Sequence, residues 1–171
     1  MKPTFWQRLD VIARSMTPFL LTLAFVVLAQ VPLHIPGFAE VAPILPLMAV
    51  YHWTIYRPDL LPAVAAFFAG LLYDALSGMP FGVSAAVFVI VHLVVMSQQV
   101  FFQGKSFPVI WLGFTLVAAG AVFMTWLLNA LFFAAITPVN VAFAQYLVTV
   151  GAFPVLAWLL TRWQRTILAQ V

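Results

Sequence analysis

Asp74 is the first candidate for a chemical role, because it is an acidic residue at the end of a long apolar segment. A helix that begins at Leu60 would place Asp74 about 21 Å along its axis, near one boundary of a membrane. Ionisable residues inside a membrane are costly and are usually functional. Two interpretations are open: a carboxylate that faces protein just inside the boundary, or an ionised helix end solvated by the Ser77-Gly78 turn.

Three further polar residues, Gln30, Asn129 and Gln145, fall near the same boundary of other apolar segments. Together with Asp74 they would form one polar cluster if their helix faces converge. Hydrogen bonding between helices, at ~0.6–2 kcal/mol each, is the simpler explanation for such residues. The alternative is an outward-facing cavity for a small ligand or for a helix of a partner.

The sequence offers little else that could perform catalysis. His52 and His92 lie at different expected depths, which does not suit a haem pair. The chain has no cysteine, and its three histidines and four acidic residues form no metal-binding motif. Gly104-Lys105-Ser106 lacks the earlier glycine of a phosphate-binding loop, since Gln99 stands there. We therefore expect a protein that is not an enzyme and has no cofactor.

Composition predicts the elements that position these residues. Of the 171 residues, 65% are hydrophobic and only 6% are charged, whereas a soluble domain has roughly 25% charged residues. About 20 helical residues cross a bilayer core. We expect an all-α membrane protein with one transmembrane domain, residues 1–171, and about six helices in a bundle: 16–33, 42–56, 60–76, 81–100, 108–133 and 139–160.

The seven Lys and Arg residues indicate the orientation of this bundle. With six spans all of them fall on one side, whereas a five-span alternative, with segment 42–56 re-entrant, would divide them between both sides. Cytoplasmic loops are enriched in Lys and Arg, so both termini are expected in the cytoplasm. The charges are scattered singly between apolar runs, which favours membrane lipids as partners over nucleic acid.

Small residues on one stripe of segment 60–76 indicate a helix-contact face. Ala66 and Gly70 are one helical turn apart, and small residues let two helix backbones approach closely. Packing within the bundle is the default expectation for this face, and contact with a partner is the alternative.

Four short motifs follow one another between residues 43 and 82: Pro43-Ile44-Leu45-Pro46, Tyr56-Arg57-Pro58, Gly70-Leu71-Leu72-Tyr73-Asp74 and Pro80-Phe81-Gly82. In order and spacing they resemble the MreD family of bacterial rod-shape-determining proteins. Phe81 stands where the family usually has Leu. Outside this region the resemblance is in length, number of spans and hydropathy.

The resemblance implies a non-enzymatic scaffold of the cell-elongation machinery in the bacterial cytoplasmic membrane, which binds the membrane-anchored protein MreC. MreB, RodA and a class B penicillin-binding transpeptidase would be indirect partners. It also implies Asp74 as the polar site residue, Ala66 and Gly70 as a contact face, and Arg57 with Asp59 as an anchor at the inner turn.

The family is similar in fold to the substrate-binding subunits of energy-coupling-factor vitamin transporters, which bind their ligand from the outer side. The alternative function is therefore a small-molecule-binding subunit of a membrane transporter with an outward-facing pocket.

Overall fold

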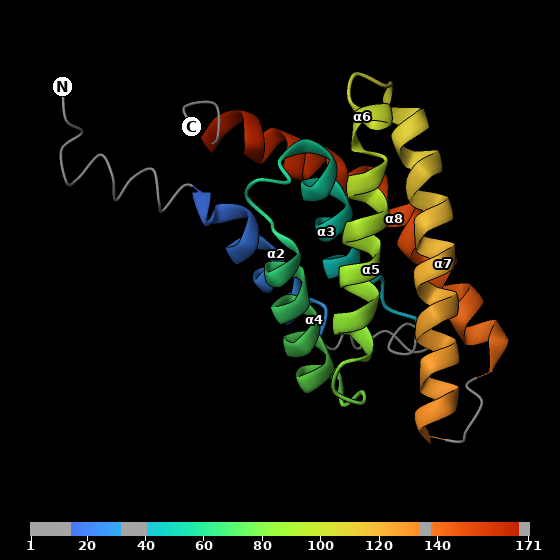
Figure 1. Cartoon of the computed structure of the whole chain (residues 1–171). Helices are drawn as coiled ribbons and strands as arrows, with labels where there is room; N and C mark the ends of the chain where they lie inside the picture. The colour runs from blue at the N-terminus through green and yellow to red at the C-terminus, as the bar shows by residue number, and fades with distance from the viewer. Residues whose placement is uncertain (1–14, 32–40, 134–137, 168–171) are drawn as a thin grey trace, which may run out of the picture.

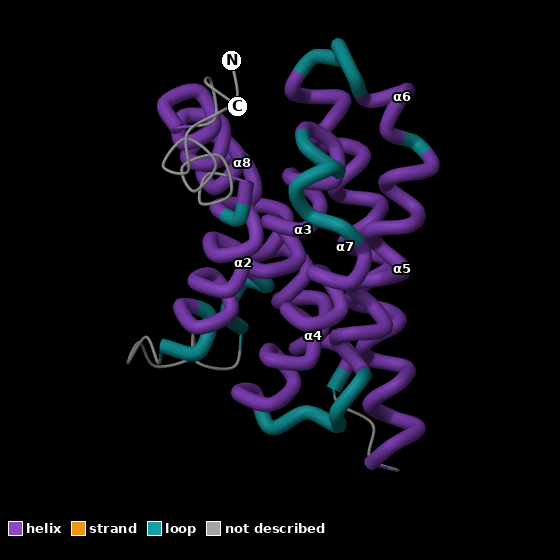
Figure 2. Tube along the Cα trace, turned by 60° about the vertical axis from the view of Figure 1, so that its left-hand side comes forward, coloured by secondary structure: helices purple, strands orange, loops and turns teal. Residues whose placement is uncertain are grey.

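The computed structural model describes residues 15–31, 41–133 and 138–167, and the regular structure within these residues is entirely helical. The prediction of an all-α protein is confirmed. The helices and their bounds are α2 (Thr17–Leu28), α3 (Leu45–Tyr56), α4 (Ala63–Ser77), α5 (Val83–Ser97), α6 (Gln99–Phe102), α7 (Phe107–Phe133) and α8 (Val139–Ile167). Short turns connect α3 to α4, α4 to α5 and α6 to α7 (Figure 2).

Prolines begin several of these helices. Pro18 and Pro46 lie in the first turns of α2 and α3, and Pro62 precedes α4. The first turn tolerates proline because its N–H groups have no partner within the helix. The last helix extends past Leu160, the predicted end of that segment, to Ile167. Residues 161–167 continue the helix because most of them, including two arginines and a glutamine, are compatible with helical structure.

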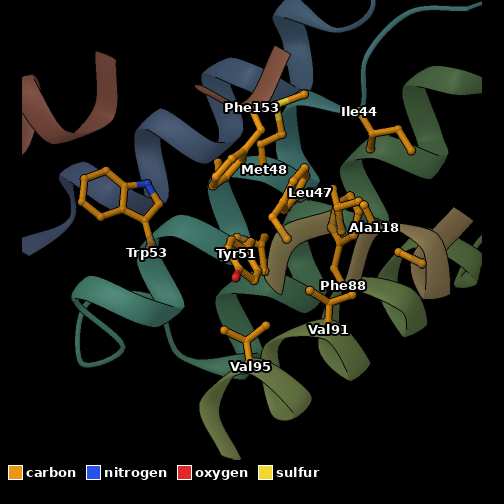
Figure 3. Packing of buried hydrophobic residues seen from close by; sticks show 14 of the residues in the cluster. Ile44, Leu47, Met48, Tyr51, Trp53, Phe88, Val91, Val95, Ala118 and Phe153 are labelled. Carbon is orange, nitrogen blue, oxygen red and sulfur yellow. The ribbon is translucent and has the colours of Figure 1, made fainter. Parts of the chain in front are cut away.

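The short helix α3 is the centre of the bundle. It contacts each of the other described helices, and all ten of its residues from Pro46 to Ile55 are buried. A helix that is apolar on every side belongs inside a protein or a membrane. Figure 3 shows this packing, with Tyr51 among the core residues and Trp53 on another side of α3. The second segment, which hydropathy alone leaves doubtful, therefore organises the whole core.

Aromatic rings join α3 to the two longest helices. The Tyr51 ring packs edge-on against Phe114 and Phe153, with centroid distances of 5.2 and 5.6 Å. Phe114 and Phe153 stack on each other at 4.1 Å. The Tyr51 hydroxyl donates a hydrogen bond to the Ile110 carbonyl oxygen at 2.9 Å. The buried hydroxyl is thus paired within the core, as buried polar groups require.

The outer surface of the longest apolar helices is itself apolar. On α7 an exposed stripe consists of Leu112, Leu116, Phe123, Leu127 and Leu131. Two helical stretches, Phe107–Phe132 and Val139–Thr166, are long and apolar enough to cross a membrane, and α2, α4 and α5 are shorter apolar helices. Water-soluble monomers rarely expose apolar patches of this extent.

The connections lie at two opposite ends of the bundle. In Figure 1 the α3–α4 connection, α6 and the C-terminal end of α8 lie at the top, and the α4–α5 turn and the last turn of α7 lie at the bottom. Arg57, Lys105, Arg162 and Arg165 belong to segments of the first end. We call it the basic end, and the opposite one the turn end. The remaining basic residues, Lys2, Arg8 and Arg14, lie outside the described residues.

Candidate functional site

Two glycines shape the turn that connects α4 to α5. Gly78 ends α4 with φ 70°, and Gly82 precedes α5 with φ 100°. Residues with a side chain rarely adopt such positive φ angles, whereas glycine does so without a steric penalty. The turn reverses the chain, so that the start of α5 lies against the last turns of α4 (Figure 2).

Asp74 caps α5 across this turn. Its carboxylate accepts hydrogen bonds from the backbone N–H groups of Gly82 at 2.9 Å, Ser84 at 2.9 Å and Ala85 at 3.5 Å. These groups belong to the start of α5, where helical N–H donors have no partner in their own helix. Gly82, the N-cap residue, has no side chain that could accept them. Asp74 therefore supplies from α4 the acceptor that α5 lacks.

The surroundings of Asp74 exclude the solvated helix end considered from sequence. The residue has 0% exposure, and its negative charge faces the positive end of the α5 dipole. Three N–H donors and this dipole together stabilise a buried carboxylate, which would otherwise be costly. The carboxylate is thus engaged by the protein backbone.

The small-residue face of α4 makes this arrangement possible. Ala66 and Gly70 are both buried. A Cβ atom added to Gly70 would lie 2.4 Å from the Cα atom of Ala85, far inside the contact distance of two carbon atoms. The two helix backbones meet at Gly70, one turn before Asp74, so this face packs against α5.

Asn129 approaches the same turn from α7. Its side-chain amide lies 4.0 Å from the sulfur atom of Met79, which also lies 4.0 Å from the Ser84 hydroxyl. Sulfur is only a weak acceptor. The Asn129 Oδ1 atom is buried and has no hydrogen-bond partner among the described residues. Met79 thus connects α7 to the Asp74 cap by weak contacts.

Gln145 lines a small internal cavity near the Asp74 cap. Its amide donates to the Ala42 carbonyl oxygen at 3.3 Å. The cavity, of about 20 Å³, is lined by Gln145, Ser84, Tyr73, Thr125 and six apolar or sulfur-containing side chains. This volume holds about one water molecule. Asp74, Asn129 and Gln145 are therefore brought near one another through Met79, Ser84 and this cavity.

The remaining predicted residues lie apart from this group. Gln30 is half-buried just after α2, and no side-chain contact joins it to the others among the described residues. Arg57 and Asp59 form an ion pair at the basic end, with 3.4 Å between Arg57 Nε and Asp59 Oδ1. Asp59 is 61% exposed, and exposed pairs contribute only about 0–1 kcal/mol.

The sequence analysis did not single out Ser84 or Met79 as partners of Asp74. One sequence pattern could have indicated a cap across the turn. Asp74 stands four positions before Gly78, which ends its helix, and Pro80 and Gly82 follow before the next apolar run. A second buried pair was also missed. The Thr54 hydroxyl lies 2.9 Å from His92 Nδ1 and donates to the Val50 carbonyl oxygen at 2.7 Å.

The arrangement suits a structural role better than a catalytic one. A general base needs a free acceptor within reach of a substrate, and the Asp74 carboxylate is occupied by three backbone donors. Within the described residues no group of three or more His, Asp or Glu side chains could hold a metal ion. The hydrogen bonds of Asp74 to the start of α5 can instead fix the angle and the distance between α4 and α5.

The helices have an apolar outer surface, and the polar cluster around Asp74 joins two of them. These features are those of an α-helical membrane protein. Residues 10–168, nearly the whole chain, match the family model described as rod shape-determining protein MreD. The chain belongs to the MreD family, as the motifs between residues 43 and 82 indicated. It therefore has a role in rod shape determination, within a family of shape-determining structural proteins that is part of the MreBCD system. No curated protein and no solved structure matches the chain.

Proposed function

We propose that the protein is a non-enzymatic scaffold of the bacterial cell-elongation machinery that binds MreC directly. MreB, RodA and a class B penicillin-binding transpeptidase are proposed as indirect partners, reached through MreC. Membership of a shape-determining family supports this function. The observation that carries it is the role of Asp74. It is the one buried carboxylate of the described residues, and it holds α4 and α5 together instead of facing a ligand.

The proposal includes a topology of six spans in one domain, residues 1–171, with both termini in the cytoplasm. The common position of Arg57, Lys105, Arg162 and Arg165 at the basic end supports it. α3, at 12 residues, is about 18 Å long and shorter than a bilayer core of about 30 Å. The burial of its residues from Pro46 to Ile55 supports its inclusion as a span, because neighbouring helices rather than lipid surround this part of the helix.

A small-molecule-binding transport subunit is the alternative function. It requires an outward pocket near Asp74 and Gln145, and drug-sized ligands occupy about 300–1,000 Å³. The cavity beside Gln145 is about 20 Å³. A larger cavity of about 430 Å³ between α7 and α8 is lined by apolar and aromatic side chains and not by Asp74 or Gln145. The small size of the cavity beside Gln145 supports the scaffold over the transport subunit.

Co-purification tests the scaffold directly. The full-length chain with an affinity tag is extracted in mild detergent from cells that express tagged MreC, and bound MreC is quantified. We expect stoichiometric recovery of MreC, and loss of rod shape when the chain is depleted. Normal rods in a clean deletion strain, or no recovered MreC from a folded chain, would overturn the proposal.

Native mass spectrometry of the same preparation separates the two functions. The scaffold predicts complexes that contain MreC. A vitamin-sized molecule that the chain alone retains would support the transport subunit instead, if it persists in the G120A control and is lost in Q145L.

A further inference from the structure

A groove on α8 near the basic end combines features that the scaffold function does not use. Two adjoining cavities, of about 420 and 440 Å³, share Trp158 and Thr161 in their walls. The first lies between α3, the start of α7 and α8, and the second follows α8 toward its C-terminal end. We call the two together the α8 groove. It extends from Phe153 to Thr166, which is about 20 Å of helix.

The two halves of the groove differ in chemistry. The first half is lined mainly by apolar side chains, among them Phe107, Ile110, Phe153 and Ala157. The second half is lined by Arg162, Arg165 and Thr166 in addition to the shared residues. An apolar slot that leads into a cationic end is complementary to an amphiphile with an anionic head.

Within the described residues no acidic side chain pairs with Arg162 or Arg165. They are three residues apart on one helix, which places them on neighbouring positions of one face, and both are exposed. Within the described residues the one ion pair is that of Arg57 with Asp59, and the other acidic residue, Asp74, is bound to the start of α5. Arg162 packs over the Trp158 ring at 5.5 Å, which keeps its guanidinium group at the groove without neutralising it.

His52 is a buried polar group at the wall of the groove. It lines the apolar half and is only 1% exposed. Neither ring nitrogen makes a hydrogen bond of full geometry among the described residues, and the Gln164 side chain is the polar partner beside the ring. A buried polar group without a partner destabilises a protein. An oxygen atom of a ligand in the groove would be a stronger partner for the ring than the Gln164 side chain.

We propose that the α8 groove binds one anionic phospholipid of the membrane. Its phosphate lies between Arg162 and Arg165, and one acyl chain lies in the apolar half against the exposed side chains of Phe107 and Trp158. An ester oxygen of the lipid replaces Gln164 beside the His52 ring. Basic pockets between helices at a membrane surface are suited to anionic lipid headgroups. The inference does not depend on MreC binding, because it follows from the groove alone.

Native mass spectrometry of the full-length protein tests the inference. The protein is released from bilayers that contain equal amounts of phosphatidylglycerol and phosphatidylcholine, and retained lipid is counted. We expect one tightly retained phosphatidylglycerol. The double variant R162Q/R165Q should bind it about 30-fold more weakly, since each basic residue near an anionic lipid contributes about fivefold. The variant R57Q/K105Q removes the same charge from the same end outside the groove, and should bind as the parent does.

Further arms distinguish the groove from general surface charge. T161W places a large ring where the two halves meet and should expel the lipid while both arginines remain. Glycerol phosphate at millimolar concentration should not displace the lipid, because it lacks the acyl chain. Equal retention of both lipids by the parent, or equal losses in R162Q/R165Q and R57Q/K105Q, would overturn the proposal. Circular dichroism of each variant confirms that a loss of lipid is not a loss of fold.

Discussion

At the scale of single residues, several polar side chains inside this apolar bundle bind the backbone of another segment of the chain. Asp74 binds three N–H groups of α5, Tyr51 binds the Ile110 carbonyl oxygen, and Gln145 binds that of Ala42. The N–H groups at the start of a helix, such as those that Asp74 binds, have no partner within their own helix, and in a membrane there is no water to supply one. A polar side chain at such a place is therefore stabilising even where the surroundings are apolar.

The first prediction concerns Asp74. In D74N the side-chain amide keeps one oxygen acceptor, but its NH₂ group replaces the second carboxylate oxygen. This NH₂ group is a donor, so it cannot accept from the N–H groups of α5, and the negative charge is lost. We expect a loss of about 1.5–3 kcal/mol in the free energy of unfolding, the range for hydrogen bonds to charged groups. Thermal unfolding in detergent measures it. The exposed Asp59 is the control, since D59N should change stability by about 0.5 kcal/mol or less; equal melting temperatures for both variants would contradict the cap.

At the scale of elements, two contacts determine how the helices fit together: the backbone contact of α4 with α5 at Gly70, and a hydrogen bond that joins α7 to α8. Pro154 lies inside α8 and has no N–H group, so the carbonyl oxygen of Val150 has no donor four residues later. The Trp111 indole N–H of α7 donates to that oxygen at 3.0 Å. The proline therefore creates the acceptor that holds the two long helices together.

A second prediction tests the close approach of α4 and α5. G70A places a methyl group 2.4 Å from the backbone of α5, so the helices must separate. We expect a loss of about 1–3 kcal/mol, as for other overpacked cores, measured as a lower melting temperature. G120A is the matched control, because a Cβ atom at Gly120 meets nothing within 4 Å. It should be neutral or slightly stabilising, since alanine favours a helix. Equal losses in both variants would show that α4 and α5 are not in backbone contact there.

A third prediction uses a double-mutant cycle on α7 and α8. W111F removes the indole donor and leaves the Val150 carbonyl oxygen without a partner, at a cost of about 1–3 kcal/mol. In the P154A background the new N–H group of residue 154 can bind that oxygen, so W111F should cost about 1 kcal/mol less there. Melting temperatures of the four proteins measure this coupling. Additive effects would mean that Trp111 acts only through its packing.

At the scale of the whole molecule, the chain forms one bundle around a short buried helix. Every other described helix contacts α3, while the longer helices α7 and α8 present apolar stripes outward. In a bilayer this arrangement is stable because lipid covers the outer stripes, and helix packing and hydrogen bonds hold the interior together. The basic end and the turn end then lie at opposite membrane surfaces.

A fourth prediction concerns orientation. The chain has no cysteine, so single cysteines can be introduced without background. Phe81, in the α4–α5 turn, is 74% exposed, and Lys105 is exposed at the basic end. With both termini in the cytoplasm, F81C should react with a membrane-impermeant maleimide in intact spheroplasts and K105C only after permeabilisation. The reverse pattern would invert the proposed topology, and labelling of both on one side would exclude it.

The sequence by itself determined the class, the helical fold and the family of this protein. With 6% charged residues the chain cannot cover a water-soluble surface, and the ordered motifs between Pro43 and Gly82 indicated the family that the match over residues 10–168 shows. These properties depend on composition and local order, which a sequence displays directly.

Only the tertiary structure decided which faces meet. From sequence the depth of Asp74 was uncertain by about one helical turn, and both a solvated and a buried carboxylate were compatible with it. The positive φ angles at Gly78 and Gly82 direct the start of α5 toward Asp74. Gln30, predicted to join the same cluster, has no hydrogen bond to it among the described residues. The α8 groove, too, required the structure. Its walls come from α3, α7 and α8, and their relative positions depend on packing between residues about a hundred positions apart, which the order of residues does not display.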